Sequence, residues 1–507
     1  MNRVDSEPWE LHLIDMSKTG VKPTINWQKC ATEMARLIDS DSLLTSQEKL
    51  APYECDGLSV YRQKPAMVAL PKTVEEAMNI LKYCKQNRIP VIARGAGTGL
   101  SGGAMPLENS VVLSLARFNR VLNIDKENRS AVVQPGVRNL AISEAVDHLG
   151  LYYAPDPSSQ IACTIGGNVA ENSGGVHCLK YGLTVHNVLG IKFLTIEGEI
   201  IELGGETLDT PGYDLLALMH GSEGLLGVVV EVTVKLLPKP EIAQVVLAAF
   251  NDVEKAGQGV ADIIAAGIVP AGLEMMDRLA IEAAEAFANV GYPAVEAILL
   301  CELDGTIEGV TDHTGSVEEI LKQAGATEIR TSKNKAERLN FWAGRKAAFP
   351  AVGRLAPDYY CMDGTIPKSA LPKVLKQIAS WSKEYGLPVA NVFHAGDGNM
   401  HPLILYDANK PGELEQTEEF GEKILKLCVE VGGTITGEHG VGTEKLDSMC
   451  FQFGKFELEQ FFAIKDAFDP DRLLNPGKAV PTLHRCAELG RMHVHNGQLP
   501  HPELERF

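Results

Sequence analysis

Four short loops rich in glycine, proline and asparagine crowd between residues 94 and 175, and they constrain the fold of this chain more than any other feature. They read RGAGTGLSGG (94–103), VQPGV (133–137), PDPSS (155–159) and TIGGNVAENSGG (164–175). Strand-like segments lie around them, at SVVLSL, SAVVQPGV, VLGIKFLTI and GVVVEVTVKLLP. Such loops at successive strand ends predict one extended ligand laid across all four.

The first loop contains the pattern G-x-G-x-x-G at Gly97, Gly99 and Gly102. A dinucleotide-binding Rossmann turn needs a helix directly after these glycines. Here Pro106 interrupts any helix and a strand follows, so the sequence excludes a Rossmann domain. Backbone N–H groups that are not shielded by Cβ atoms can still close around an anion such as pyrophosphate, and Arg94 at the loop entrance suits it. Taken alone, the loop is also compatible with a flexible surface connection.

The segment FHAGDGNMHP (393–402) places two histidines around an Asp-Gly pair with apolar flanks. Asp-Gly between apolar segments predicts a two-residue hairpin turn of type I′. In that register His394 and His401 would be directly opposed on one face, with Cβ atoms about 5 Å apart. Two imidazoles placed in this way can bind one metal ion. The alternative is a pair of surface histidines.

Two further segments offer partners for such a site. TGEHGVG (436–442) carries Glu438 and His439, and two histidines with one carboxylate would leave coordination positions open for substrate. Arg345 in FWAGRKAAFPAVGR could bind a carboxylate bidentately through its planar guanidinium. The alternatives are an unrelated acidic turn and a solvated arginine on a helix.

The composition excludes several classes of protein. A formal charge of −19 argues against nucleic acid as a partner. The ten cysteines form no CxxC pair, so an iron–sulfur or zinc-ribbon site is excluded and we expect reduced, mostly buried thiols. No run reaches the roughly 18 apolar residues of a membrane span, and the N-terminal residues lack the apolar core of a signal peptide. We therefore expect a cytoplasmic protein without a direct membrane span.

Together with GSEGLLGVV (221–229), the four loops resemble in order and spacing the FAD-binding domain of the vanillyl-alcohol oxidase/p-cresol methylhydroxylase (VAO/PCMH) superfamily. The resemblance implies an α+β fold, with a two-lobed FAD-binding domain and an α+β substrate domain built on an antiparallel sheet. It implies these bounds: a helical lead-in at 1–60, the FAD-binding domain at 61–240, the substrate- and metal-binding domain at 241–480, and a tail at 481–507.

The same resemblance implies FAD, with its pyrophosphate in the 94–103 loop. That loop holds no histidine or cysteine, so we expect non-covalent binding. The residues expected to bind FAD are Arg94, Gly95, Ala96, Gly97, Thr98, Gly99, Leu100, Ser101, Gly102, Pro135, Gly136, Pro155, Asp156, Pro157, Ser158, Thr164, Ile165, Gly166, Gly167, Asn168, Glu171, Asn172, Gly174, Gly175, Gly227, Val228 and Asn475.

The hairpin and the 436–442 segment resemble the C-terminal domain of the FAD-linked 2-hydroxy-acid dehydrogenases. Carried onto this sequence, the resemblance makes His394, His401 and Glu438 the ligands of one divalent metal (Zn, Mn or Fe). It makes His439 the catalytic base and Arg345 the arginine that binds the substrate carboxylate.

A finer resemblance, from about residue 60 to the C-terminus, is to the flavin subunits of bacterial glycolate dehydrogenases. FWAGRKAAFPAVGRLAPDYYCMDGTIP and LHRCAELGRMHVH carry it. It implies oxidation of glycolate to glyoxylate, and of D-lactate to pyruvate, by hydride transfer to the flavin. It also implies a second FAD-type subunit and an iron–sulfur subunit that pass electrons to the quinone pool, which allows peripheral association with the inner face of the cell membrane.

The strand after the second histidine bears on the substrate. Leu403 and Ile404 offer no polar group for a second carboxylate, which favours a small 2-hydroxy-monocarboxylate. Two alternatives stay open: a stand-alone D-lactate or other D-2-hydroxy-acid dehydrogenase, and a non-catalytic flavin-bearing assembly subunit.

Overall fold

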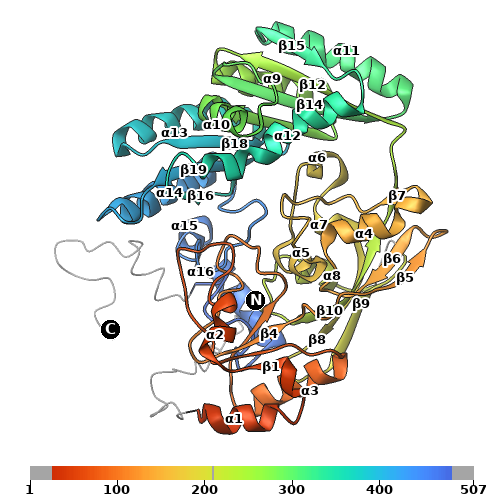
Figure 1. Ribbon diagram of the computed structural model, residues 1–507, viewed down its shortest axis with the longest axis vertical. Coiled ribbons are helices and arrows are strands. Elements are labelled where there is room, and N and C mark those ends of the chain that lie inside the picture. Colours follow the sequence, from red (N-terminus) through yellow and green to blue (C-terminus); the bar gives the residue numbers. More distant parts are fainter. Residues whose placement is uncertain (1–24, 208–210, 482–507) are drawn as a thin grey trace, which may run out of the picture.

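The computed structural model describes residues 25–207 and 211–481, so most of the expected tail lies outside the described residues. The chain forms two parts, and Figure 1 shows the second part above the first. The first part carries two larger sheets built from residues 43–235 and a two-stranded sheet of residues 151–152 and 237–238. The second part is built on one large sheet from residues 242–406. The chain then returns to the first part, where Leu474 makes a parallel bridge to Val91.

A four-stranded sheet opens the first part, in the order β1-β2-β4-β3. The strands β2 and β3 both run parallel to β4. A helix, α3, packs against it. Its N-cap residue is Thr73, whose Oγ1 accepts a hydrogen bond from the Glu76 N–H at 3.2 Å, and the two residues form a capping box. The elements are α1 (Trp27–Met34), η1 (Ser40–Ser42), β1 (Leu43–Leu44), α2 (Gln47–Leu50), η2 (Ala51–Tyr53), β2 (Met67–Ala69), α3 (Val74–Gln86), β3 (Val91–Arg94) and β4 (Val111–Ser114).

A five-stranded antiparallel sheet follows, in the order β5-β6-β10-β8-β9. The expected strands around the glycine loops are confirmed as β4, β6, β8 and β10, and the 94–103 loop leads to β4 without a helix, as expected of a non-Rossmann turn. The elements are β5 (Val121–Asp125), β6 (Ser130–Val133), α4 (Asn139–Val146), η3 (Asp147–Leu149), β7 (Leu151–Tyr152), α5 (Ile165–Glu171), α6 (Cys178–Tyr181), α7 (Thr184–Asn187), β8 (Val188–Leu194), β9 (Ile200–Gly204), α8 (Leu215–Met219), β10 (Val228–Lys235) and β11 (Leu237–Pro238).

The second part holds an eight-stranded antiparallel sheet, in the order β15-β12-β14-β13-β18-β19-β16 with β17 also on β19. Two of its helices end close to glycines: α13 is capped by left-handed Gly386, and α14 ends two residues before Gly432. The elements are β12 (Ile242–Phe250), α9 (Val253–Ala265), β13 (Gly272–Asp277), α10 (Arg278–Ala288), β14 (Ala297–Gly305), α11 (Ile307–Gln323), β15 (Glu328–Thr331), α12 (Lys335–Val352), β16 (Asp358–Cys361), β17 (Gly364–Thr365), η4 (Lys368–Ala370), α13 (Leu371–Tyr385), β18 (Val389–His394), β19 (Asn399–Tyr406), α14 (Glu413–Glu430), α15 (Met449–Gln452) and α16 (Lys455–Phe468).

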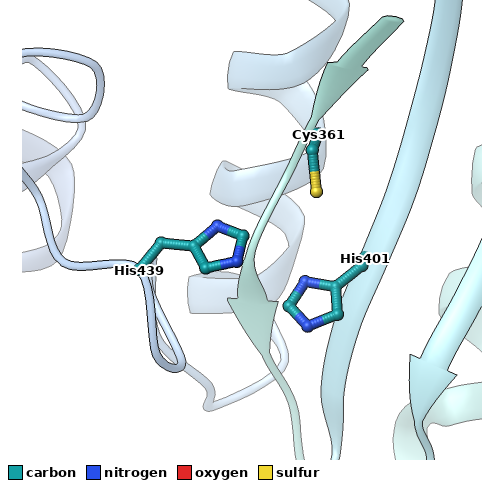
Figure 2. A group of neighbouring side chains, drawn as sticks. All are labelled: Cys361, His401 and His439. Carbon is teal, nitrogen blue, oxygen red and sulfur yellow. The ribbon is translucent and has the colours of Figure 1, made fainter. Parts of the chain in front are cut away.

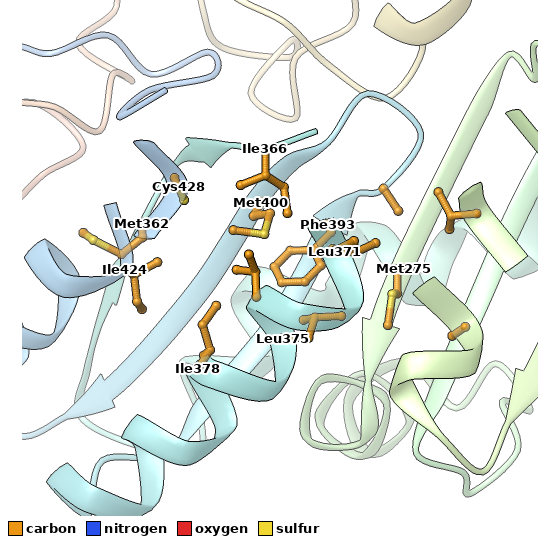
Figure 3. Packing of buried hydrophobic residues seen from close by; sticks show 14 of the residues in the cluster. Met275, Met362, Ile366, Leu371, Leu375, Ile378, Phe393, Met400, Ile424 and Cys428 are labelled. Carbon is orange, nitrogen blue, oxygen red and sulfur yellow. The ribbon is translucent and has the colours of Figure 1, made fainter. Parts of the chain in front are cut away.

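Both faces of this large sheet are covered by helices. One face packs against α9, α11, α13 and α14, and Figure 3 shows Met275 and Phe393 in this layer. The next residues along these strands, Met276 and Val392, point to the opposite face, which packs against α10 and α12. Because side chains alternate along a strand, Glu274 and His394 share that second face and lie toward α12.

The cysteines and the helices bear on two expectations drawn from composition. Among the cysteines of residues 25–207 and 211–481, eight are free thiols and seven of these are buried, but Cys450 is disulfide-bonded. The expectation of reduced cysteines throughout is therefore wrong at that residue, because sequence spacing does not reveal which thiols meet in space. In residues 25–207 and 211–481, no helix has the length and apolarity that crossing a bilayer requires.

Candidate active site

The histidine hairpin is formed by β18 and β19, but its turn is longer than predicted. His394 pairs with Asn399, and the His394 carbonyl accepts hydrogen bonds from the N–H groups of Asp397 (3.3 Å) and Gly398 (3.1 Å). A type I′ turn needs two residues with positive φ, and in this turn only Gly398 has one, at 85°. A Cβ at Gly398 would lie 2.1 Å from the Ile366 carbonyl oxygen. The predicted turn type and the direct opposition of the two histidines are therefore wrong.

The two histidines nevertheless face each other, because in the observed register His401 is the diagonal neighbour of His394. Their ring centroids are 5.1 Å apart. Glu438 Oε1 lies 3.1 Å from His401 Nε2 and 3.5 Å from His394 Nε2. One ligand atom from each of the three residues falls within 4.8 Å of the others. The structure thus brings together the three residues predicted to bind metal.

The charges in this cluster depend on one another. Burial opposes the charge of Glu438, but the two histidines outweigh it and hold the pKa of Glu438 well below its usual range. Burial also opposes a charge on His394, but Glu274 and Glu438 raise the pKa of His394 well above its usual range. The result is a buried carboxylate flanked by two imidazoles, a donor set that suits a divalent cation.

The loop that carries Glu438 is folded around the carboxylate of Asp363. This carboxylate accepts hydrogen bonds from Thr436 Oγ1 at 2.6 Å and from the backbone N–H groups of residues 437–439 at 3.0 to 3.3 Å. Lys445 Nζ lies 3.1 Å away, and both charged side chains are fully buried. Burial opposes the charge of Asp363, but Lys445 and His439 outweigh it and lower its pKa. The ion pair therefore fixes the backbone of the 436–440 turn.

His439 lies beside the cluster without belonging to its three donors. Its ring stacks on His401, with centroids 5.0 Å apart and planes 11° apart. Burial lowers the pKa of His439 to about 4. Its Nδ1 atom is buried and has no hydrogen-bond partner in the described structure. A neutral imidazole in this place can accept a proton.

A cavity of about 400 Å³ joins this cluster to the glycine loops, and His401, Glu438 and His439 are in its wall. At Gly97, where φ is 69°, a Cβ would lie 2.2 Å from Arg94 Nη2. Thr164 Oγ1 and Glu171 Oε2 are buried here and have no hydrogen-bond partner among the described residues. The predicted residues that line the cavity are Arg94, Gly95, Ala96, Gly97, Thr98, Gly99, Leu100, Pro135, Pro157, Ser158, Thr164, Gly166, Gly167, Asn168, Glu171, Gly227 and Val228.

The other predicted cofactor residues do not line the cavity. Asn475, for example, donates hydrogen bonds from Nδ2 to the carbonyls of Gly103 (3.0 Å) and Glu223 (2.6 Å), which both line the cavity. The predicted residues outside the wall are Ser101, Gly102, Gly136, Pro155, Asp156, Ile165, Asn172, Gly174, Gly175 and Asn475.

Comparison with known proteins decides the family. Residues 239–479 match the family of FAD linked oxidases, C-terminal domain, and residues 65–204 match an FAD binding domain. The chain is 62% identical over 489 residues to glycolate oxidase subunit GlcD of Escherichia coli (strain K12), covering 96% of this chain and 98% of that protein. It is 32% identical to a D-lactate dehydrogenase of Anaerostipes hadrus, covering 86% and 94% of the two chains. The chain belongs to the FAD-linked oxidases.

The fold of this FAD-linked oxidase agrees with that assignment. A crystal structure of p-cresol methylhydroxylase with substrate bound superimposes with a TM-score of 0.77 at 18% identity, covering 92% of this chain and 98% of the other. The predicted α+β fold of the VAO/PCMH type is confirmed. The prediction of an FAD-dependent oxidoreductase is confirmed as well.

Several residues at the site of this FAD-linked oxidase escaped the sequence analysis. Glu274 contacts His394, Asp363 holds the 436–440 turn, and Phe349 of α12 lines the cavity with its ring centroid 6.2 Å from that of His401. Glu223 ties the FAD-binding part to the turn, because its carboxylate accepts the N–H groups of Val441 and Gly442 at 2.7 Å each. A lone carboxylate inside a strand of apolar residues was the available signal for Glu274.

Arg345 is close to the cluster but does not line the cavity. It is buried, its Nε donates a hydrogen bond to Glu274 Oε2 at 2.8 Å, and its Nη2 lies 2.6 Å from the same oxygen. Leu403 and Ile404 pack into the hydrophobic layers on the two faces of the sheet and do not line the cavity either. Their apolar character therefore says nothing about substrate size, and the expectation of a small 2-hydroxy acid rests on the resemblance alone.

A second set of donors, Cys361, His401 and His439, has its ligand atoms within 4.8 Å of one another. Figure 2 shows these three side chains. In this set the donor would be a thiol whose pKa burial and Asp363 raise well above its usual range. His401 Nδ1 lies 3.4 Å from the Met362 carbonyl, which accepts its proton, while Nε2 points toward Glu438. Because Nδ1 of His401 carries the proton, Nε2 is the atom free to bind a metal, and it faces Glu438. The structure therefore favours the donor set that contains His394 and Glu438.

Proposed function

We propose that this FAD-linked oxidase oxidises glycolate to glyoxylate, with D-lactate to pyruvate as a second reaction. The E. coli relative that spans almost the whole chain is named a glycolate oxidase subunit, and a more distant one is named a D-lactate dehydrogenase. The observation that carries the proposal is the shared cavity: His401, Glu438 and His439 open onto the same space as the glycine loops.

Non-covalent FAD fits the cavity. Five of the ten residues in the 94–103 loop are glycines, which leaves its backbone accessible. In the part of the chain that the structure describes, Thr164 Oγ1 and Glu171 Oε2 are polar atoms of cavity-lining residues without hydrogen-bond partners. Cys163 also lines the cavity, but burial raises the pKa of its thiol, which makes it a poor nucleophile for a flavin tether. The residues proposed to hold the cofactor are those predicted from the sequence, in the wall or directly behind it.

One divalent ion fits the donors His394, His401 and Glu438, because two imidazole nitrogens and one carboxylate suit Zn, Mn or Fe. When bound, FAD would supply a two-electron acceptor and the ion a positive charge for the substrate oxygens. The protein side chains then do the rest. His439 would take the hydroxyl proton on its imidazole, and Phe349 would close the site with an apolar wall. Arg345, which the sequence suggested for the substrate carboxylate, pairs with Glu274 outside the cavity wall and would act through Glu274 instead.

We further propose that electrons leave through partner subunits. The word "subunit" in the name of the E. coli relative supports an assembly, and a chain without CxxC pairs needs another chain to carry iron–sulfur clusters. A second FAD-type subunit and an iron–sulfur subunit would link the enzyme to the quinone pool. The chain would then work in the cytoplasm, held peripherally at the inner face of the cell membrane by those subunits.

An anaerobic substrate screen tests this proposal. The purified FAD-bound chain is mixed in turn with glycolate, D-lactate, L-lactate and 2-hydroxyglutarate, and bleaching of the flavin absorbance is followed. We expect the fastest bleaching with glycolate, slower bleaching with D-lactate, and little with the other two.

Faster bleaching with D-lactate than with glycolate would favour a stand-alone D-lactate dehydrogenase, the second candidate that the Anaerostipes relative supports. Bleaching by none of the acids, before and after treatment with a chelator, would favour a non-catalytic flavin-bearing subunit.

A further inference from the structure

Glu274 connects two residues of the site although it lies outside the cavity. It is on β13, next to β18 in the sheet, and it is 1% exposed. Its Oε1 lies 2.8 Å from His394 Nδ1, and its Oε2 accepts the hydrogen bond from Arg345 Nε at 2.8 Å. One carboxylate therefore contacts a residue from β18 and a residue from α12.

A buried carboxylate is costly unless its charge and its lone pairs are matched. Here both oxygens have partners, and Arg345 supplies the opposite charge, with its Nη2 atom 2.6 Å from Glu274 Oε2. Glu274 is therefore an anion that contacts His394 Nδ1, on the side of the ring away from Glu438.

An ionised carboxylate can only accept hydrogen bonds, so the proton of the contact belongs to His394 Nδ1. When this imidazole is neutral, its Nε2 then has a free lone pair, and Nε2 is the atom that points toward Glu438 at 3.5 Å. The contact also fixes the rotation of the ring. This is the arrangement in which a histidine binds a metal through Nε2.

We propose that Glu274 is a positioning residue of the metal site. It holds His394 in the tautomer and orientation that present Nε2 to the ion, and Arg345 holds Glu274 in turn. This inference rests on the proposed function, because it assumes that His394, His401 and Glu438 bind a divalent ion.

The chain offers a matched control in Glu302. It lies on the neighbouring strand β14, and its carboxylate accepts a hydrogen bond from Arg338 at 2.9 Å, seven residues before Arg345 in α12. Its Oε1 atom lies 3.5 Å from His177 Nε2, and His177 does not belong to the proposed metal cluster. The same substitution in Glu302 therefore removes a buried glutamate–arginine pair without touching a proposed ligand.

The test measures metal binding by the FAD-bound full chain, with Mn²⁺ in a calorimetric titration and Co²⁺ in absorption spectra. We expect Glu274→Gln to weaken Mn²⁺ binding by about 10- to 100-fold and to change the Co²⁺ spectrum. Glu302→Gln should bind Mn²⁺ as tightly as the wild type. Thermal unfolding of each variant, followed by circular dichroism, separates lost binding from lost folding.

A double variant, Glu274→Gln with Arg345→Met, covers the case in which the unpaired arginine unfolds the single variant. It leaves no unpaired buried charge and should still bind Mn²⁺ weakly. Wild-type affinity in a folded Glu274 variant would overturn the role of Glu274 alone. No Mn²⁺, Zn²⁺ or Co²⁺ binding by the wild type would overturn the proposed metal site, and this inference with it.

Discussion

Two buried glutamates on neighbouring strands have nearly the same surroundings. Glu274 on β13 and Glu302 on β14 lie on one face of the sheet, two register positions apart, and each pairs with an arginine of α12. The arginines, Arg345 and Arg338, are seven residues apart, about two helical turns. Each glutamate also meets a histidine. Nothing in these first contacts separates a metal site from a structural ion pair.

The two pairs differ in what the histidine contacts on its other side. The ring of His177 bridges Glu302 and Asp156, lies between the two parts of the molecule, and its side chain is 27% exposed. The side chain of His394 is 3% exposed, and its far carboxylate, Glu438, is shared with His401. A carboxylate–histidine–carboxylate bridge is therefore a structural contact by itself. A second imidazole that converges on the same carboxylate turns it into a candidate metal site.

The largest expected effect comes from replacing the histidine of each pair. His394→Ala should lose the bound ion and lower glycolate turnover about 1,000-fold, since a metal contributes several kcal/mol to the transition state. His177→Ala should keep the ion and lose less than about tenfold, because it changes only a structural contact. Metal analysis and flavin reduction kinetics of both variants measure this. Equal losses in the two variants would contradict the distinction.

The next effect concerns the turn that supplies the shared carboxylate. Asp363→Asn removes one partner of a fully buried ion pair and leaves Lys445 unpaired, which should lower the free energy of unfolding by about 3–5 kcal/mol. Glu302→Gln should lower it by only about 1–3 kcal/mol, because Arg338 remains partly exposed. Denaturant unfolding of both variants checks the order. A smaller loss for Asp363→Asn would show that the turn does not depend on Asp363.

A smaller effect is expected from pH. Burial opposes the charge of His177, but Asp156 and Glu302 raise its pKa well above the usual value. Its stabilisation is therefore complete below its unfolded-state pKa of about 6.5 and is lost as pH rises through the folded-state pKa. Between pH 6 and pH 10 the wild type should lose on the order of 1 kcal/mol more stability than His177→Gln. Thermal melting curves at several pH values test this, and parallel curves would rule it out.

The smallest effect sharpens the choice of ligands. Cys361→Ser should leave Mn²⁺ affinity within about threefold of the wild type, because the sulfur lies outside the favoured donor set. Co²⁺-loaded wild type should also lack a thiolate charge-transfer band in the near ultraviolet. Loss of metal in this variant would move the ion to the Cys361, His401 and His439 group.

Features with local determinants were predictable from the sequence. The strands around the glycine loops and the absence of a Rossmann helix follow from short stretches of chain, and the structure has them. The hairpin turn failed although the Asp-Gly signal is real, because Gly398 sits at the end of a four-residue connection rather than in its middle. The two histidines still meet, since a shift of two residues keeps side chains on the same face.

The residues behind the site were not predictable in the same way. Glu274 in GLEMMD and Glu302 in LLCELDG carry the same sequence signal, a glutamate with an apolar residue on either side within a strand. Only the folded structure shows that Glu274 contacts His394 and that Glu302 contacts His177. Asp363 likewise meets the 437–439 backbone from a distant segment, and no spacing along the chain predicts that contact.

A crystal structure of the FAD-bound enzyme grown with Mn²⁺, recorded for anomalous scattering, tests the central claim most directly. The metal site described above predicts one strong anomalous peak between His394 Nε2, His401 Nε2 and Glu438. A peak beside Cys361, a peak beside His177 and Asp156, or no peak between the two hairpin histidines would contradict it.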